Sequence, residues 1–238
     1  MKPLYSIIIP AYNEEKLLPL TLAALQSAMQ AQPEKGELIV VDNNSSDATA
    51  EIAKSHGARV VFEPVNRIAS ARNAGARVAE GEFLVFADAD TIVPPGLLSA
   101  ALAGLSSSSV CGGGARVAFD RELPFLVRGF ASLWNYCAPR WGYAAGCFVY
   151  CRRDAFVETG GFDERVYASE EIGLSIRFRQ WGRRHGMKFL VLDESVVSSA
   201  RKMDWHNSFK MLLTMIFLGL CPFAVRSRRF CYLWYQRP

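Results

Sequence analysis

The first hundred positions alternate between short apolar runs and longer amphipathic stretches. Apolar runs rich in β-branched or aromatic residues are typical of buried parallel strands and occur at 6–10, 38–41, 60–62 and 83–87. Between them, apolar residues recur at helical spacing over 17–29, 48–54 and 69–79. This order predicts a parallel sheet with right-handed crossovers and flanking helices.

The pattern is less regular after residue 96. A helix over 97–105 leads into a serine run at 106–109 that we interpret as a loop. Further strands are predicted at 110–119, within 143–151 and at 188–192, and helices over 123–137, 153–159 and 172–181. The chain is therefore predicted to be an α/β protein throughout.

Polar residues follow the predicted strands at their carboxyl ends, where open α/β sheets bind ligands. Asn13 and Glu14 follow the first strand, Asp42 and Asn43 the second, and Asp88 and Asp90 the fourth. Residues two apart in extended backbone point the same way, so Asp88 and Asp90 can present both carboxylates together. Such oxygen donors suit Mg²⁺ or Mn²⁺ shared with phosphate. The alternative for this stretch alone is a polar turn that closes a buried strand.

Composition and short motifs limit the classes of ligand that the chain is expected to bind. The net charge of +4 suits an anionic substrate or an acidic membrane surface, and the chain shows no nucleic-acid-binding signature. Neither GxGxxG nor GxxxxGK[ST] occurs, which disfavours dehydrogenases and P-loop proteins and favours a metal bridge to phosphate. The six cysteines form no CxxC pair, and the N-terminus does not resemble a secretory signal. We therefore expect reduced, mostly buried thiols in a cytoplasmic protein.

Residues 211–225 form an apolar run with basic residues on both sides. Lys210 precedes it, and Arg226, Arg228 and Arg229 follow it. Fifteen residues fall short of the roughly 20 needed to span a bilayer. Three alternatives remain open for this tail: it lies in the membrane interface on the cytoplasmic face, it packs on the protein itself, or it packs on a second subunit in a homodimer.

Five segments match, in order, the motifs of glycosyltransferase family 2, and the chain resembles that family over almost its whole length. The segments are 6–15, 41–49 (usually VDDGSxDxT), 71–75 (ARNxG), 88–90 (DxD), and 160–164 followed by 170–171 (GGFDE…ED). The resemblance implies the GT-A fold: a mostly parallel Rossmann-like sheet flanked by helices, a smaller mixed acceptor-side sheet and a C-terminal helical tail. It assigns residues 1–105 to the nucleotide sugar, 106–200 to the acceptor and catalytic base, and 201–238 to the basic-flanked apolar tail.

The resemblance also implies an activity: inverting transfer of a single sugar from a nucleoside-diphosphate sugar, UDP- or GDP-linked, to an acceptor hydroxyl. The residues implied for the nucleotide pocket are Pro10, Ala11, Tyr12, Asn13, Glu14, Asp42, Asn43, Arg72, Asp88, Ala89 and Asp90. Asp90, with Asp88, would hold Mn²⁺ or Mg²⁺ against the diphosphate. Arg201 or His206, beyond the last strand, would add a metal or phosphate contact, although His185 and His206 are expected to be surface residues. The QxxRW motif of processive synthases is absent, and the acceptor stays open, a lipid-linked one included.

Two positions depart from the family pattern. Asn43 stands where an aspartate is common, which replaces a charged contact to the base by an amide contact. The catalytic pair reads Glu170-Glu171, with Gly173 where an aspartate is often found. We assign Glu171 as the base and keep Glu170 as the alternative. The competing function is a nucleotide-sugar-binding protein with little or no turnover. A sugar-phosphate nucleotidyltransferase is disfavoured because 10–13 is not a glycine-rich basic loop.

Overall fold

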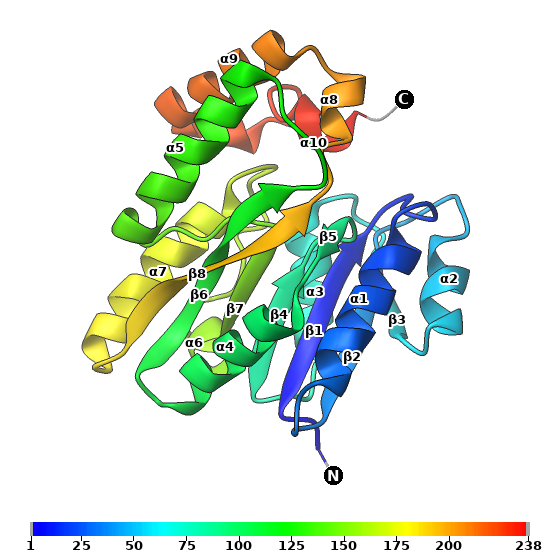
Figure 1. The fold of residues 1–238 in the computed structure, drawn as a ribbon, viewed down its shortest axis with the longest axis vertical. Coiled ribbons are helices and arrows are strands. Elements are labelled where there is room, and N and C mark those ends of the chain that lie inside the picture. Colours follow the sequence, from blue (N-terminus) through cyan, green and yellow to red (C-terminus); the bar gives the residue numbers. More distant parts are fainter. Residues whose placement is uncertain (1, 237–238) are drawn as a thin grey trace.

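The computed structural model describes residues 2–236, which form one eight-stranded sheet with helices on both faces (Figure 1). The strands are β1 (Tyr5–Ala11), β2 (Gly36–Asp42), β3 (Arg59–Phe62), β4 (Phe83–Ala87), β5 (Thr91–Ile92), β6 (Val110–Phe119), β7 (Phe148–Arg152) and β8 (Lys188–Ser198). Their order across the sheet is β3-β2-β1-β4-β7-β6-β8-β5.

The sheet changes character at β4. β1 pairs in parallel with β2 and β4, and β2 pairs in parallel with β3. β7 is antiparallel to both β4 and β6, whereas β6 and β8 are parallel to each other. The predicted α/β fold with a mostly parallel first half is confirmed, and the mixed half continues the same sheet across the β4–β7 pairing. The sequence did not predict β5, which has only two residues.

The apolar strand residues divide between the two faces of the sheet. Ile7 and Ile9 of β1 pack with α1 (Leu18–Gln30) and α4 (Pro95–Ser106), whereas Ile8 packs with α3 (Ile68–Val78) and α7 (Glu170–Arg184) on the other face. α2 (Thr49–Ser55) and α6 (Arg153–Glu158) complete these two layers. Because successive strand residues point to opposite faces, a strand covered on both sides must be apolar throughout, as β1 is.

The remaining helices gather beyond one end of the sheet, at the top of Figure 1. They are α5 (Phe125–Trp141), α8 (Lys202–Trp205), α9 (Ser208–Leu220) and α10 (Tyr232–Tyr235), with a 3₁₀ helix η1 (Pro222–Arg226). Asn135 fixes α5 against β6 because its amide exchanges two hydrogen bonds with the backbone of Val117, at 2.8 and 3.0 Å. The apolar run of the tail is not one helix, since α9 ends at Leu220 and Pro222 begins η1.

All six cysteines lie within the described residues and are free thiols, although only three of them are buried. Among the helices of residues 2–236, none has both the length and the apolar character required to cross a bilayer.

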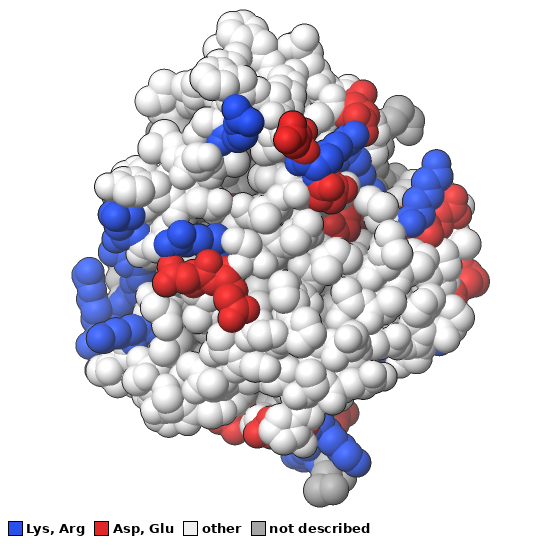
Figure 2. All heavy atoms as spheres, in the orientation of Figure 1, with Lys and Arg blue, Asp and Glu red and all other residues white. Residues whose placement is uncertain are grey.

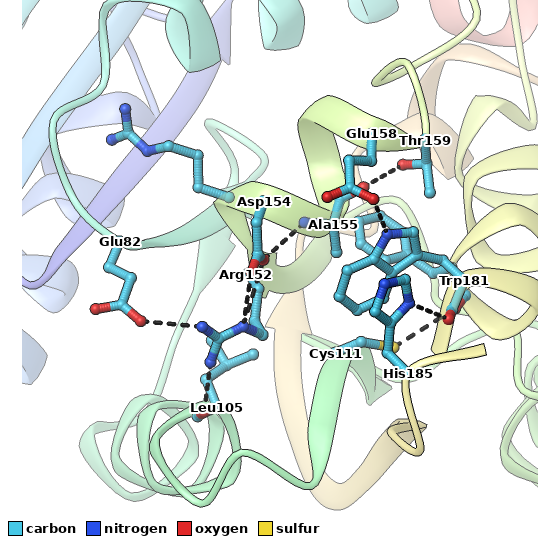
Figure 3. A network of polar contacts seen from close by, with 12 residues as sticks. Glu82, Leu105, Cys111, Arg152, Asp154, Ala155, Glu158, Thr159, Trp181 and His185 are labelled. Carbon is cyan, nitrogen blue, oxygen red and sulfur yellow. Dashed lines mark hydrogen bonds and ion pairs between the residues drawn. The ribbon is translucent and has the colours of Figure 1, made fainter. Parts of the chain in front are cut away.

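A polar network occupies the sheet edge opposite the acidic strand ends (Figure 3). Arg152, at the end of β7, contacts Glu82 at 3.1 Å, and Phe83, at the start of β4, is its partner in the sheet. Nearby, the indole N–H of Trp181 donates to Glu158 at 2.8 Å, and the exposed His185 ring stacks on Trp181 at 3.8 Å. His185 is thus a surface residue, as predicted, and it lies at the end of the sheet opposite to Asp88.

Candidate active site

The loops that follow β1 and β2 are tied to each other. The backbone N–H of Asn13 donates to the hydroxyl of Ser45 at 3.0 Å, and the Asn13 side chain accepts from the backbone N–H of Ser46 at 2.8 Å. Asn13 adopts a positive φ of 50°, a conformation that asparagine tolerates better than most residues. Asp42 accepts from the backbone N–H of Ser45 at 2.9 Å. Asn13 and Asp42 therefore shape these loops through their side-chain oxygens.

Asn43 holds the segment after β3. Its amide group donates to the carbonyls of Glu63 and Val65, at 2.9 and 2.6 Å, and its oxygen accepts from the backbone N–H of Arg67. Both amide hydrogens are thus engaged within the protein, and the oxygen retains one lone pair for a ligand. A carboxylate at this position could not donate to the two carbonyls, which gives the departure from the family pattern a structural reason.

Arg201 brings the start of the tail into contact with two acidic residues. Its guanidinium donates to both carboxylate oxygens of Glu14, at 2.7 and 2.5 Å, and lies 2.9 Å from Asp90. Glu14 is buried, so the bidentate pair supplies the charge compensation that a carboxylate removed from water requires. Burial raises the pKa of Asp90 to about 6, with Arg201 opposing and Asp88 adding to the shift.

A first cavity of about 90 Å³ opens beside these residues. Its walls come from the loops after β1 and β2, the DxD segment, α8 and the C-terminal α10, and comprise Pro10, Ala11, Tyr12, Glu14, Asn43, Asn66, Ile68, Asp88, Ala89, Asp90, Arg201, Lys202, Trp205, Arg228, Leu233, Trp234 and Tyr235. Three basic side chains face it together with Asp88 and Asp90. The mixture suits an anionic ligand that carries its own cation.

Arg72 lies behind the DxD segment and is fully buried. It donates to Glu170 and to Asp88, both at 2.7 Å, and to the carbonyl of Gly146 at 2.7 Å. Burial works against its charge, but Asp88 and Glu170 outweigh that effect and raise the pKa of Arg72 further above its usual range. Glu170 is likewise buried, so this arginine neutralises one member of the Glu170-Glu171 pair.

Glu171 has no such partner among the ion pairs of residues 2–236. Its carboxyl group lies against Gly146, where an added Cβ would stand 3.5 Å from the carboxyl carbon. Burial is the main cause that raises the pKa of Glu171 to about 8, and Glu170 adds to the shift while Arg72 opposes it. A carboxyl with a pKa near neutrality is suited to accept a proton in catalysis.

The ARN motif positions the neighbouring glycine-rich turn. The Asn73 side chain accepts from the backbone N–H of Phe162 at 3.0 Å and donates to its carbonyl at 2.9 Å. Gly160 and Gly161 both have positive φ, which explains the glycine pair. Phe162 in turn packs 5.2 Å from the Arg72 guanidinium. The two motifs are thus linked through Asn73 and Phe162 to Arg72, which contacts Glu170.

A second, larger cavity of about 330 Å³ joins the first at Asp88, which lines both. Arg72, Glu170 and Glu171 line this second cavity and not the first. Asn13 and Asp42 line neither cavity. The structure thus divides the predicted site residues into a group around Asp90 and a group around Glu171, with Asp88 between them.

Sequence reasoning missed most of the contribution of the tail. Lys202, Trp205, Arg228 and Trp234 line the first cavity, yet only Arg201 and His206 were singled out beyond β8. His206 is not among the residues that line either cavity. The basic residues around the apolar run were the one available signal, and contact of that run with a membrane, with the protein itself or with a second subunit had been left open.

Comparison with known proteins identifies the family. The family model described as "Glycosyl transferase family 2" matches residues 6–160, more than half of the chain. Validoxylamine A glucosyltransferase of Streptomyces hygroscopicus subsp. limoneus is 37% identical over 107 residues, 42% of this chain and 23% of that protein. Undecaprenyl-phosphate 4-deoxy-4-formamido-L-arabinose transferase of Photorhabdus laumondii is 37% identical over 97 residues, 38% of this chain and 30% of that protein. The alignments thus span less than half of these relatives.

Solved structures show the same fold. The mannosyltransferase PcManGT of Pyrobaculum calidifontis, in complex with GDP-Man and Mn²⁺, superposes with a TM-score of 0.63 at 22% identity over 83% of this chain and 57% of that one. Glucosyl-3-phosphoglycerate synthase of Mycobacterium tuberculosis, in complex with Mn²⁺, UDP and glucosyl-3-phosphoglycerate, gives 0.61 at 20% identity over 92% of this chain and 80% of that one. The family-model match and the GT-A architecture together place this chain in glycosyltransferase family 2.

Proposed function

We propose that this protein transfers a single sugar, with inversion, from a UDP- or GDP-linked donor to an acceptor hydroxyl. The observation that carries the proposal is the junction of two cavities at Asp88, with the Asp90 group in one and the unpaired carboxyl of Glu171 in the other. Donor and acceptor would meet at this junction. PcManGT in complex with GDP-Man and Mn²⁺ supports the donor class as a relative in fold.

The first cavity is proposed to bind the nucleoside diphosphate. Arg201, Lys202 and Arg228 face it and would contact the diphosphate oxygens, while Asn43 and Tyr12 would face the nucleoside. Ligand pockets usually span about 300–1,000 Å³, so a wall must open to admit a nucleotide sugar. That wall includes Trp234 and Tyr235 of the short helix α10.

A divalent metal fits the Asp88–Asp90 pair. Each carboxylate contacts its arginine through one oxygen, Asp88 with Arg72 and Asp90 with Arg201, and both face the first cavity. Residues 2–236 contain no group of three or more His, Cys, Asp or Glu arranged to hold a metal. Mn²⁺ or Mg²⁺ would therefore take its other ligands from the diphosphate and water, a familiar arrangement for Mg²⁺. When bound, the metal would act as a Lewis acid that stabilises the leaving diphosphate.

Glu171 is proposed as the general base. The acceptor oxygen forms a bond to the anomeric carbon, the bond from that carbon to the diphosphate breaks, and its electron pair leaves with the diphosphate. The proton of the acceptor hydroxyl passes to the Glu171 carboxylate. Glu170 is the poorer candidate because Arg72 already holds it in a buried ion pair. A single displacement from the face opposite the leaving group inverts the anomeric carbon.

Incubation with Mn²⁺ and a panel of UDP-, GDP- and dTDP-sugars tests the proposal. Release of the nucleoside diphosphate from one donor, by hydrolysis or transfer, supports it. Tight binding of a donor without release, even with total lipid extract and soluble sugars supplied as acceptors, would instead establish a nucleotide-sugar-binding protein.

We also propose that the tail contacts the membrane surface from the cytoplasmic side. The outer faces of α9 and η1 expose large apolar side chains, among them Phe209, Leu213, Leu220 and Phe223. Residues 205–238 contain basic residues and no acidic ones. An apolar face with a basic flank favours an anionic bilayer interface.

A further inference from the structure

Most of the side chains that line the second cavity are apolar. Among residues 2–236, the charged side chains that line it are those of Arg72, Asp88, Glu170, Glu171 and Lys202. Asp88 and Lys202 also line the first cavity, so this charged end lies at the junction between the two. Away from that junction, the cavity is bounded mainly by apolar side chains.

Those apolar walls are built by two helices and one strand. α5 contributes Val127, Phe130, Ala131 and Trp134, at the i, i+3, i+4, i+7 spacing of a single helix face. α9 contributes Met211, Leu212 and Met215, and β6 contributes Val117 and Phe119. Methionine and aromatic side chains provide an adaptable apolar surface. Because such a surface offers few hydrogen bonds, a sugar hydroxyl would gain little by entering this part of the cavity.

The same two helices are also apolar on their outer sides. The exposed large apolar residues of α5 and α9 are Phe125, Leu126, Leu133, Tyr136, Trp141, Phe209, Leu213, Ile216, Phe217 and Leu220. Figure 2 shows the corresponding upper region as a largely white surface with few charged side chains. A helix that is apolar all round is expected inside a protein or in lipid. Here the outer sides face away from the protein.

The charge of these segments favours lipid, rather than a further protein layer, as the neighbour of the outer faces of α5 and α9. Residues 123–142 and 205–236, which include both helices, contain six Lys and Arg residues and no Asp or Glu. An uncompensated positive charge beside an apolar face matches an anionic bilayer interface. The cavity between α5 and α9 therefore lies next to the surface that is complementary to a membrane.

We propose that the second cavity is the acceptor site and that it takes an amphiphilic lipid, with the hydrocarbon chain between α5 and α9 and the hydroxyl at Glu171. This assignment rests on the proposed transferase function, because it gives Glu171 its proton to accept. The volume of about 330 Å³ is at the lower end of the range for small-molecule sites, so it accommodates one chain segment. The acceptor class is thus defined by its apolar part.

Linear alcohols test the cavity directly. Isothermal titration of the full chain with 1-hexanol, 1-octanol and 1-decanol should show one saturable site. The affinity of the site should rise about fourfold for each methylene added to the alcohol. This ratio corresponds to the free energy of burying one methylene group. Ala131→Trp, which fills the cavity from α5, should weaken 1-decanol binding at least tenfold. Ser132→Trp places the same bulk on the exposed side of α5 and should leave it unchanged.

A second variant and a nucleotide titration separate the possible failures. Leu212→Trp fills the cavity from α9 and should also weaken 1-decanol binding at least tenfold. It provides the same test if Ala131→Trp does not fold. UDP or GDP should bind the wild type and the folded cavity variants equally. Absent or chain-length-independent alcohol binding, with nucleotide binding intact, would overturn the lipid acceptor alone. Alcohol binding without binding of any nucleotide or nucleotide sugar would overturn both the acceptor assignment and the transferase on which it rests.

Discussion

Arg201 and Glu14 form a bidentate ion pair across 187 positions of the sequence, with hydrogen bonds of 2.7 and 2.5 Å. The pair joins the start of the tail to the loop after β1. Glu14 is 3% exposed and Arg201 17% exposed, so neither group is well solvated. The same guanidinium lies 2.9 Å from Asp90, which links this pair to the proposed metal site.

Replacement of Arg201 by alanine should lower the free energy of unfolding by about 3–5 kcal/mol, because it leaves the buried Glu14 carboxylate uncompensated. Chemical denaturation monitored by circular dichroism measures this difference. Arg121→Ala is the control, since Arg121 pairs with Asp204 on the exposed surface nearby and should change stability little. Equal stabilities for the two variants would contradict the importance assigned to the Arg201–Glu14 pair.

Replacement of Asp90 by alanine should remove the dependence of nucleotide binding on metal. In the wild type, Mn²⁺ should tighten UDP or GDP binding at least tenfold, because the ion joins the carboxylate to the diphosphate. Titration calorimetry with and without Mn²⁺ measures the ratio. Asp193→Ala, on the exposed side of β8, should retain the wild-type ratio. If Asp90→Ala retained it too, the metal would have to bind elsewhere.

The pH profile should report the protonation of Glu171. Its carboxyl accepts a proton only when ionised, and burial with the adjacent Glu170 raises its pKa to about 8. Activity should therefore rise with pH and level off above about pH 8, with a tenfold loss per pH unit well below that value. Initial rates of kcat/KM over pH 6–9.5 provide the measurement. A profile that is flat across pH 6–8 would rule out this shifted carboxyl as the base.

Leu213→Glu combined with Phe217→Glu should reduce binding to anionic vesicles. Both side chains are exposed on α9, and a carboxylate there opposes insertion into an anionic interface. Co-flotation with phosphatidylglycerol vesicles at low and high salt provides the test. Leu20→Glu, at an even more exposed leucine on α1, is the control. A wild-type protein that never floats with these vesicles would contradict the proposed membrane contact.

The parts of the fold that local pattern controls were predictable. The parallel strands and their acidic ends followed from apolar runs and from the residues at their carboxyl ends, and the DxD segment lies where that reasoning placed it. What local pattern does not contain is pairing between distant segments. The Arg201–Glu14 pair, the return of α10 over the first cavity and the hold of Asn73 on Phe162 each depend on how the complete chain packs.

The family resemblance had already assigned Glu171 as the base and kept Glu170 as the alternative, and the structure adds a physical reason for that proposed assignment. Two adjacent glutamates at a helix start look alike in sequence, and both complement the helix dipole. The position of the buried Arg72 distinguishes them physically, because it forms an ion pair with Glu170 and not with Glu171. The difference arises from α3 and the Gly146 segment, which are far from α7 in sequence.

The most direct test of the central claim is nucleotide release by the wild type and by Glu171→Gln with the same Mn²⁺ and donor panel. We expect the wild type to release UDP or GDP from one donor sugar. Glu171→Gln should bind that donor with unchanged affinity and release it at least a hundredfold more slowly, the usual range for loss of a general base. An equal rate of release by Glu171→Gln would contradict the account, as would a wild type that binds every donor tested and releases nucleotide from none.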